Sequence, residues 1–230
     1  MAARARRQPA GAGGQAMNAT TPLTLFGSKG SGSAAVECAL QRCGLPYDVV
    51  RASTWEEDSA REQLARANPL GQIPTLVLQD GTVLTESAAI LIHLGLQFPA
   101  SGLLPPDASA RAMALRGLVF IASNCYSAIS IGDYPERWTN ATEPLAREQV
   151  REAARRQLHR HWEIFADTFS AAPFLSGERP GALDFLAAVV TKWSGTRAHL
   201  AATRPAFAQT LKTIEADPVV AGVFARHWVA

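Results

Sequence analysis

Residues 68–87 read NPLGQIPTLVLQDGTVLTES and set the order of the elements around them. The leading NPLG predicts a loop, because Asn-Pro and Leu-Gly pairs favour turns. Pro74 comes directly before a β-type run at 75–78, a place where a strand tolerates the missing N–H. The Asp-Gly pair at 80–81 lies between that run and a second apolar run at 83–84, which predicts a β-hairpin.

The second strand of this hairpin leads into a polar pair and then an apolar helix. Glu86 and Ser87 come directly before a helix predicted over 88–96. A carboxylate and a hydroxyl at a helix start are expected to satisfy free N–H groups and to complement the helix dipole. The sequence therefore predicts a loop, a proline, a hairpin and a polar-headed helix in succession.

This ordered set resembles the second half of the thioredoxin-like domain of glutathione transferases. The resemblance implies a cis bond before Pro74, with the Ile73 N–H and C=O offered to the cysteinyl part of glutathione. It also implies that Gln72 belongs to the binding site and that Glu86 and Ser87 hold the γ-glutamyl end. Each element alone favours a simpler interpretation, in which Pro74 only starts an edge strand and the polar pair only caps a helix. The set in this order favours the family.

Length and composition are those of a soluble globular protein. A chain of 230 residues predicts one or two domains, and 47% hydrophobic with 18% charged residues is ordinary. The net charge of +2 depends on Arg4, Arg6 and Arg7, so the body is near neutral and nothing favours nucleic-acid binding. No apolar run reaches about 18 residues, so no membrane span is expected.

The cysteine and histidine patterns predict neither a disulfide framework nor a metal site. Cys38, Cys43 and Cys125 are odd in number and lack a C-x-x-C or paired metal spacing. Reduced thiols in the cytosol are expected instead. His159 and His161 resemble a ligand pair, but residues two apart lie on different helix faces.

The N-terminal residues 1–21 are predicted to be a disordered tail. They are rich in Ala, Gly and Arg and contain no acidic residue, so they cannot bury enough apolar surface to fold. They also lack the apolar segment of a secretory signal. An Arg-rich, acid-free start leaves a mitochondrial targeting peptide or an upstream start codon as explanations. The second, with translation from Met17, is the favoured one.

Two structural parts follow the tail. The first, residues 22–99, is the predicted thioredoxin-like glutathione-binding domain. The segments predicted before residue 68 are a strand at 23–26, a glycine-rich loop at 27–33, a helix at 34–42, a strand at 45–50 and a helix at 54–67. A linker at 100–107 leads to an all-helical acceptor-substrate domain at 108–230, with helices at 108–131, 143–170, 181–194, 206–216 and 218–227. The fold class is therefore α/β thioredoxin-like plus all-α, the glutathione transferase architecture.

One helix start in the second part carries half of a capping box. Asp184 falls where an N3 carboxylate bonds back to the N–H of the cap residue, here Gly181. Glutathione transferases usually carry Ser or Thr at that cap.

The glycine-rich loop decides the chemistry. A glutathione thiol has to ionise near neutral pH against a reference pKa of about 8.5. The positive end of a helix and a hydroxyl hydrogen bond both lower that pKa. Ser28, Ser31 and Ser33 supply the hydroxyls, and Ser28 is assigned to glutathione binding.

The loop departs from the known catalytic patterns of the family. Phe26 falls where the tyrosine classes carry their phenol, Gly30 where the serine classes carry their serine, and Gly32 where the cysteine classes carry their thiol. Ser31 or Ser33 is therefore the predicted thiolate donor, the alternative being that Ser33 is simply the N-cap of the helix.

The same loop matches a weak rival pattern. Residues 30–35 fit G-x-G-x-x-A, the dinucleotide fingerprint. That reading is disfavoured because no acidic residue ends the second strand at 49–51 and no further βα units follow.

The helical part is expected to complete the site. Tyr126 falls about where related bacterial transferases place a polar residue near glutathione, and it is predicted to donate its phenol to a substrate or thiolate. Asn124 is predicted to meet the peptide, so both belong to the expected acceptor pocket. The alternative makes Tyr126 a core residue with its hydroxyl capped locally. Trp138 and Trp162 either line that pocket or fill the core, and the core is favoured.

The resemblance implies a cytoplasmic detoxification enzyme. It would be a homodimeric glutathione transferase that uses glutathione as co-substrate. Its acceptor would be a small hydrophobic electrophile, a peroxide or a disulfide. No metal, membrane or nucleic-acid partner is expected. Two alternatives remain open: a glutathione-dependent thiol-disulfide oxidoreductase, which Gly32 weakens, and a non-catalytic glutathione-binding or interaction protein.

Overall fold

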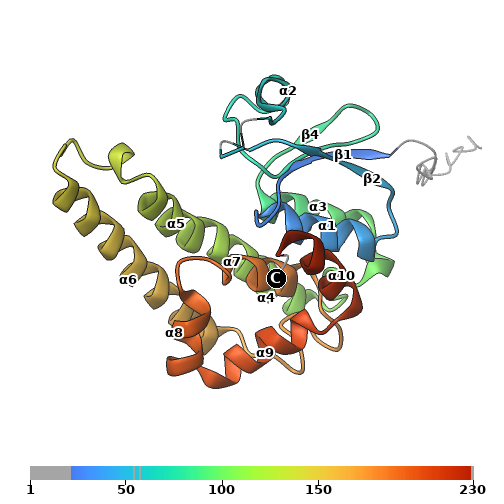
Figure 1. Ribbon diagram of the computed structural model, residues 1–230. Coiled ribbons are helices and arrows are strands. Elements are labelled where there is room, and N and C mark those ends of the chain that lie inside the picture. The colour runs from blue at the N-terminus through green and yellow to red at the C-terminus, as the bar shows by residue number, and fades with distance from the viewer. Residues whose placement is uncertain (1–21, 54, 57, 229–230) are drawn as a thin grey trace, which may run out of the picture.

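The computed structural model describes residues 22–53, 55–56 and 58–228 (Figure 1). The predicted tail at 1–21 lies outside the described residues. A four-stranded sheet has the order β2-β1-β3-β4. Its strands are β1 (Leu23–Gly27), β2 (Tyr47–Arg51), β3 (Thr75–Val77) and β4 (Val83–Leu84). β2 runs parallel to β1, whereas β3 and β4 are antiparallel to their neighbours.

Helices cover both faces of the sheet. α1 (Ser33–Arg42) and α3 (Ser87–Gln97) form a layer between the sheet and the helical part, and α2 (Arg61–Ala67) lies on the opposite face (Figure 1). The apolar and small side chains of α1 are almost all buried, because α1 is covered on both sides. α2 is shorter than the helix predicted at 54–67, of which two residues, Thr54 and Glu57, lie outside the described part.

The local turn signals are confirmed. Gly44, at φ +67°, ends α1 in the left-handed conformation that favours glycine. The hairpin forms as predicted, with the Thr82 N–H donating to the Asp80 carboxylate at 2.9 Å. The Ile73–Pro74 peptide bond is cis, as the resemblance implied.

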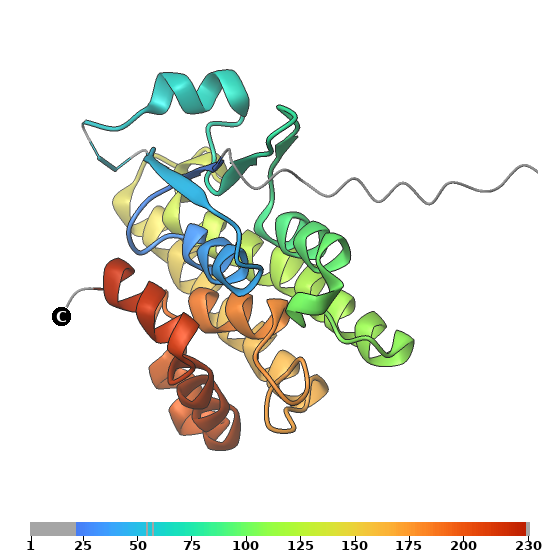
Figure 2. The same cartoon turned by 90° about the vertical axis from the view of Figure 1, so that its right-hand side faces the viewer.

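The second part of the described chain is helical. Its elements are η1 (Pro99–Ser101), α4 (Ala108–Phe120), η2 (Ile121–Cys125), α5 (Tyr126–Asp133), η3 (Pro135–Arg137), α6 (Pro144–Thr168), α7 (Ala182–Val190), α8 (Thr196–Thr203), α9 (Pro205–Glu215) and α10 (Pro218–His227). The sequence predicted one helix over 181–194, but α7 ends at Val190, and α8 was missed. Figure 2 shows these helices packed beneath the α1 and α3 layer.

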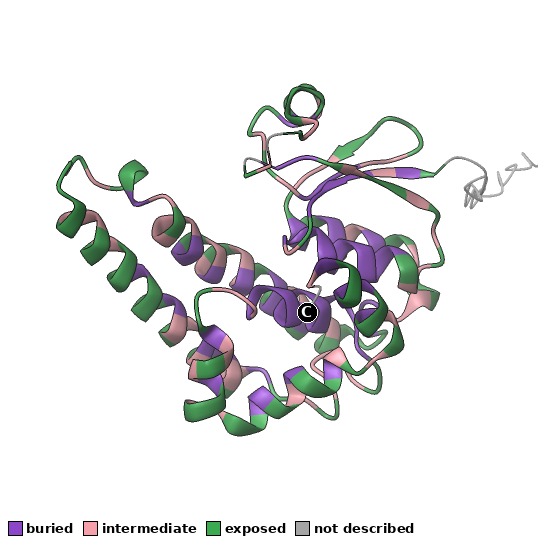
Figure 3. Cartoon of the chain, viewed as in Figure 1, coloured by how far each residue is buried: buried purple, intermediate pink, exposed green. Residues whose placement is uncertain are grey.

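The core is centred on α7, whose nine residues are all buried (Figure 3). α7 contacts α1 and α3 on one side and α4 and α9 on others. Trp162 has no exposed surface and is a core residue, as favoured. Trp138 is 58% exposed, so placing it in the core was wrong.

The half of a capping box that was predicted at the start of α7 is confirmed. Asp184 is fully buried and accepts hydrogen bonds from the N–H groups of Leu175, Ser176 and Gly181, at 2.8, 2.9 and 3.0 Å. A Cβ on Gly181 would meet the Leu103 carbonyl oxygen at 2.6 Å. This close approach explains why glycine replaces the usual hydroxyl residue at the cap.

α4, η2 and α5 form one continuous apolar helical rod. The 108–133 stretch is long enough to span a membrane, and the mean hydropathy of its most apolar window, 1.3, is high enough for a span. It packs against α6 and α7, and 39% of that window is buried; one such helix does not by itself indicate a membrane protein. η2 is a π-helical turn, a distortion frequent at functional sites.

Candidate functional site

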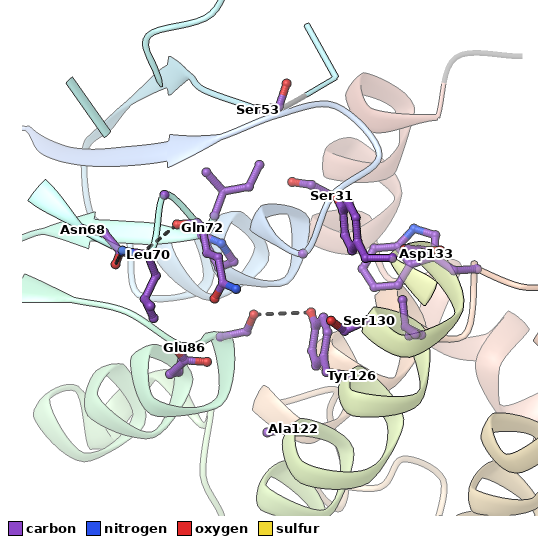
Figure 4. Close-up of a pocket in the computed structure, with 18 of the residues that line it drawn as sticks. Ser31, Ser53, Asn68, Leu70, Gln72, Glu86, Ala122, Tyr126, Ser130 and Asp133 are labelled. Atoms are coloured by element: carbon purple, nitrogen blue, oxygen red, sulfur yellow. Dashed lines mark hydrogen bonds between the residues drawn. The ribbon is translucent and has the colours of Figure 1, made fainter. Parts of the chain in front are cut away.

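A cavity of about 460 Å³ opens between the sheet and the α4–α5 rod. Figure 4 shows Ser31 and Gln72 reaching it from the first part of the chain, and Tyr126 and Ser130 from the helical part. The described residues that line it include seven of the predicted site residues: Ser31, Gln72, Ile73, Pro74, Glu86, Ser87 and Tyr126. Ser28, Ser33 and Asn124 are not among them.

The loop before the cis proline is shaped by a buried asparagine. The Asn68 side-chain amide donates to the Gln72 carbonyl at 3.0 Å and to the Thr75 hydroxyl at 3.1 Å, and its oxygen accepts from the Leu70 N–H. Within the described part of the chain, no hydrogen bond uses the N–H or C=O of Ile73. The Ile73 peptide is therefore an unpaired backbone edge at the cavity wall, a position that suits an extended ligand.

The start of α3 differs from the expected capping arrangement. Neither Glu86 nor Ser87 caps the helix through its side chain, so the capping prediction was wrong. Glu86 has φ +63°, which is uncommon for a residue with a Cβ. The Ser87 hydroxyl turns instead to the Tyr126 phenol, 3.4 Å away. The first N–H groups of α3 are left without a side-chain partner, and such groups favour an anionic ligand.

The serine hydroxyls of the glycine-rich loop bond to one another. The Ser31 hydroxyl donates to the Ser28 carbonyl at 2.7 Å and lies 2.9 Å from the Ser33 hydroxyl. Ser33 has no exposed surface and is the first residue of α1, whose N-cap is Gly32, so the alternative N-cap assignment of Ser33 was wrong. Either hydroxyl would have to leave this network to donate to a ligand, because each carries a single proton.

His227 on α10 and Trp193 between α7 and α8 both hold the Gly30 peptide of this loop. The Gly30 N–H donates to Nδ1 of His227 at 3.2 Å, and the Trp193 indole N–H donates to the Gly30 carbonyl at 3.1 Å. Nε2 of His227 therefore carries the proton and donates to the Glu37 carboxylate at 2.6 Å. Burial by itself would raise the pKa of Glu37, but hydrogen bonds from His227 and Arg226, together with the positive charge of Arg226, hold that pKa below its ordinary value.

The contacts by which His227 and Trp193 hold Gly30 were not predicted from the sequence. Gly30 and His227 are 197 positions apart, and no local pattern marks a histidine near a chain end as the partner of a loop peptide. Gly30 itself has φ +69°, a conformation that disfavours a side chain.

Tyr126 is a third residue of the helical part that approaches the loop. Its ring lies 5.9 Å from the Trp193 ring, and burial raises the pKa of its phenol to about 12. A Cβ built on Gly32 would meet the Tyr126 hydroxyl oxygen at 2.6 Å. The alternative that its hydroxyl is capped by a neighbour in its own helix does not hold, since its partner Ser87 is on α3.

Asn124 is turned toward its own helix. Its side-chain amide donates to the Phe120 carbonyl at 3.1 Å and to the Ser123 hydroxyl at 3.0 Å. The thiol groups Cys38 and Cys125 are buried, and burial raises the pKa of both, which makes them unreactive. The described residues contain no cluster of His, Cys, Asp and Glu side chains suited to a metal ion.

The outer part of the cavity carries apolar side chains, and Arg137 is the one basic residue among the described residues that line the cavity. Ile129 and Trp193 line its helical wall, and the exposed Trp55 and Leu70 lie at its rim. The Arg137 guanidinium lies 4.0 Å from the Tyr134 ring centroid and forms no ion pair with another described residue. This wall can hold a small apolar or aromatic molecule.

Comparison with known proteins points to one family. The family model for the glutathione S-transferase N-terminal domain matches residues 33–97. The uncharacterized GST-like protein YncG of Escherichia coli K12 is 31% identical over 173 residues, which cover 74% of this chain and 82% of YncG. Glutathione S-transferase GstA of E. coli O157:H7 is 25% identical, with 75% and 82% covered. A glutathione transferase homolog from Sulfitobacter, solved with bound glutathione, superposes with a TM-score of 0.78 at 26% identity, covering 89% of this chain and 98% of that one.

Proposed function

We propose that this chain, which belongs to the glutathione S-transferase family, binds glutathione in the cavity between its two parts and activates the thiol for attack on a small hydrophobic acceptor. Glutathione would be a co-substrate, and no metal is invoked. The acceptor would carry an electrophilic carbon, a peroxide or a disulfide. We place glutathione on residues 22–99 and the acceptor on residues 108–230, with 100–107 as the linker.

The observation that carries this proposal is the unpaired Ile73 peptide at the cavity wall. An extended peptide needs one N–H and one C=O to pair with, and Ile73 offers both beside the buried ring of Pro74. Asn68 holds the neighbouring Gln72 carbonyl, so the edge is rigid before any ligand arrives. The Gln72 side chain is exposed at the same wall and is proposed as a further contact.

The start of α3 suits the γ-glutamyl end of glutathione. The Glu86 carboxylate is exposed and lines the cavity, so it can pair with an ammonium group. The uncapped N–H groups around Ser87 can donate hydrogen bonds to a carboxylate. Ser28 belongs to the loop but does not line the cavity, and its proposed role is reduced to holding Ser31 and Ser33 through its carbonyl.

Thiol activation is proposed at the start of α1. Ser31 borders the cavity and is the stronger of the two serine candidates, since Ser33 has no exposed surface. The resemblance extends the proposal to a cytoplasmic homodimer with a detoxification role. Of the other functions, disulfide exchange through a protein thiol is disfavoured by Gly32. A non-catalytic glutathione-binding protein is favoured by one observation, the mutual hydrogen bonds of the two serine hydroxyls.

The test is isothermal titration calorimetry with glutathione. The wild type is expected to bind, and Glu86→Gln is expected to bind about tenfold more weakly through loss of a charge-assisted hydrogen bond. Glu148→Gln on the exposed surface of α6 is the matched control. Conjugation of an aryl halide then separates an enzyme from a binding protein. A wild type that binds no glutathione would overturn the proposal.

A further inference from the structure

We propose that the Tyr126 phenol, which reaches the loop from the helical part, donates the hydrogen bond that stabilises the glutathione thiolate. This assignment rests on the proposed function, and it gives to Tyr126 the thiolate-donor role that was considered there for Ser31. It replaces the loop side chain that supplies this bond in the tyrosine, serine and cysteine patterns, whose three positions hold Phe26, Gly30 and Gly32 here.

The first support is the position of the phenol oxygen. A Cβ on Gly32 would lie 2.6 Å from the Tyr126 hydroxyl oxygen, 3.4 Å from the Ser87 hydroxyl and 3.5 Å from Cδ of Pro74. The phenol therefore occupies space that a side chain at position 32 would need. It stands between the start of α1 and the cis proline, where the cysteinyl part of glutathione is proposed to bind.

The second support is that this donor is available. Among the described residues, the one hydrogen bond of the Tyr126 phenol is the 3.4 Å contact with Ser87, which is long for a pair of hydroxyl groups. The Ser31 and Ser33 hydroxyls are held at 2.7 to 2.9 Å inside the loop. A ligand thiolate thus competes with a weak partner at Tyr126 and with strong ones at the serines.

The third support is the way the phenol is held. Tyr126 directly follows the π-helical turn η2, and its ring packs on the Trp193 indole. The same indole donates to the Gly30 carbonyl at 3.1 Å, so one side chain positions both the phenol and the loop. Such shared support fixes a donor before the ligand binds.

The chemistry balances without a protein base. The S–H bond of glutathione breaks, its proton passes to water, and the sulfur keeps the electron pair. Tyr126 keeps its own proton, because burial raises the pKa of its phenol to about 12, and it donates that O–H to the thiolate.

The experiment measures the thiol pKa of bound glutathione from the ultraviolet absorbance of the thiolate. The proteins are the full chain as wild type, Tyr126→Phe, Ser31→Ala and Ser33→Ala. Tyr134→Phe is the matched control, since this second tyrosine lines the same cavity beneath Arg137. Each protein is also titrated calorimetrically with S-methylglutathione, which has no ionisable thiol.

Tyr126→Phe is expected to raise the bound thiol pKa by about one to two pH units, the worth of a hydrogen bond to a charged group. Its affinity for S-methylglutathione should stay within about twofold of the wild type, and Tyr134→Phe should leave the thiol pKa unchanged. If Tyr126→Phe binds both ligands and the thiol pKa does not move, or if a serine variant moves it instead, the assignment to Tyr126 is overturned alone. If the wild type binds neither ligand, the proposed function fails and this assignment fails with it.

Discussion

Glu37 on α1 and His227 on α10 form a buried hydrogen-bonded pair, with Nε2 of the imidazole 2.6 Å from a carboxylate oxygen. They are 190 positions apart in the sequence. The other imidazole nitrogen accepts from the Gly30 N–H, so α10 holds the loop that borders the candidate site. The helix that closes the fold is thereby also a structural support of the candidate site.

Replacing His227 with phenylalanine should destabilise the protein. The substitution keeps a ring but leaves the Gly30 N–H without its acceptor and removes one donor from the buried Glu37 carboxylate, which keeps Arg226 and Tyr47 as donors. Leaving a buried polar group unsatisfied costs about 1 to 3 kcal/mol. Urea unfolding measures this loss. His93→Phe on α3 is the control and should change the free energy of unfolding by less than about 1 kcal/mol. An equally small loss for His227→Phe would show that the pair does not stabilise the fold.

The Glu37 pair also predicts a pH dependence. The folded-state pKa of Glu37 lies below its ordinary value, because His227 and Arg226 outweigh the effect of burial. Its stabilisation is therefore complete above the unfolded-state pKa of about 4.3 and is lost as the pH falls through the lower folded-state pKa. Glu37→Gln should reduce stability at pH 7 and flatten its fall between about pH 5 and pH 3. Glu148→Gln should keep the wild-type slope, and a wild-type slope in Glu37→Gln would contradict the prediction.

Gly181→Ser is expected to destabilise the protein, although serine is the better N-cap by propensity. The new Cβ would meet the Leu103 carbonyl oxygen at 2.6 Å and the Ser176 side chain at 2.8 Å, so the backbone must shift. Overpacking of this kind costs about 1 to 3 kcal/mol in thermal or urea unfolding. The comparison is Gly222→Ala in α10, where a Cβ meets nothing within 4 Å and helix propensity favours alanine. The prediction is wrong if both variants gain stability.

The sequence predicted what is encoded by neighbouring residues. The Asn-Pro loop, the Asp80-Gly81 turn and the end of α1 at Gly44 depend on backbone preferences within a few positions, and all three are confirmed. Gly32 was predicted to depart from the cysteine pattern, and in the fold a Cβ at this position would meet the Tyr126 hydroxyl, which reaches it from a distant part of the sequence. A contact between residues so far apart in the sequence cannot be predicted from the preferences of neighbouring residues.

The errors have the same physical origin. Predicting side-chain caps at the start of α3 assumed that helix N–H groups bind the nearest polar residue, whereas the Ser87 hydroxyl lies beside Tyr126, 39 positions away. The Trp193 bond to Gly30 spans 163 positions and could not be inferred from a single sequence. α8 was missed because its eight residues carry only a short apolar pattern.

Glu86 is expected to lower the stability of the fold and to strengthen the binding of glutathione. Its φ of +63° disfavours residues with a Cβ, and strain of this kind is of order 1 kcal/mol or more. Glu86→Gly removes the strain and the carboxylate, whereas Glu86→Ala removes only the carboxylate. Both should bind glutathione about tenfold more weakly by calorimetry. The glycine variant should be more stable than the alanine variant by about 1 kcal/mol in urea unfolding. Equal stabilities would mean that the backbone at Glu86 is not strained.

Gly32 and Tyr126 should be energetically coupled. Gly32→Ala places a Cβ where the phenol oxygen now lies, so Tyr126 must move and glutathione binding should weaken by about tenfold. Tyr126→Phe removes that oxygen and the closest contact with it, so the same Gly32→Ala change made in the Tyr126→Phe background should cost less than about threefold. A double-mutant cycle measured by calorimetry with glutathione gives the coupling directly, since residues in contact depart from additivity. Gly132→Ala on α5 is the matched control, because its Cβ would find only an ordinary contact of 3.8 Å with Ala154. Strict additivity of the Gly32 and Tyr126 changes would mean that the phenol is not held over the loop, and the donor role assigned to Tyr126 would lose its geometric basis.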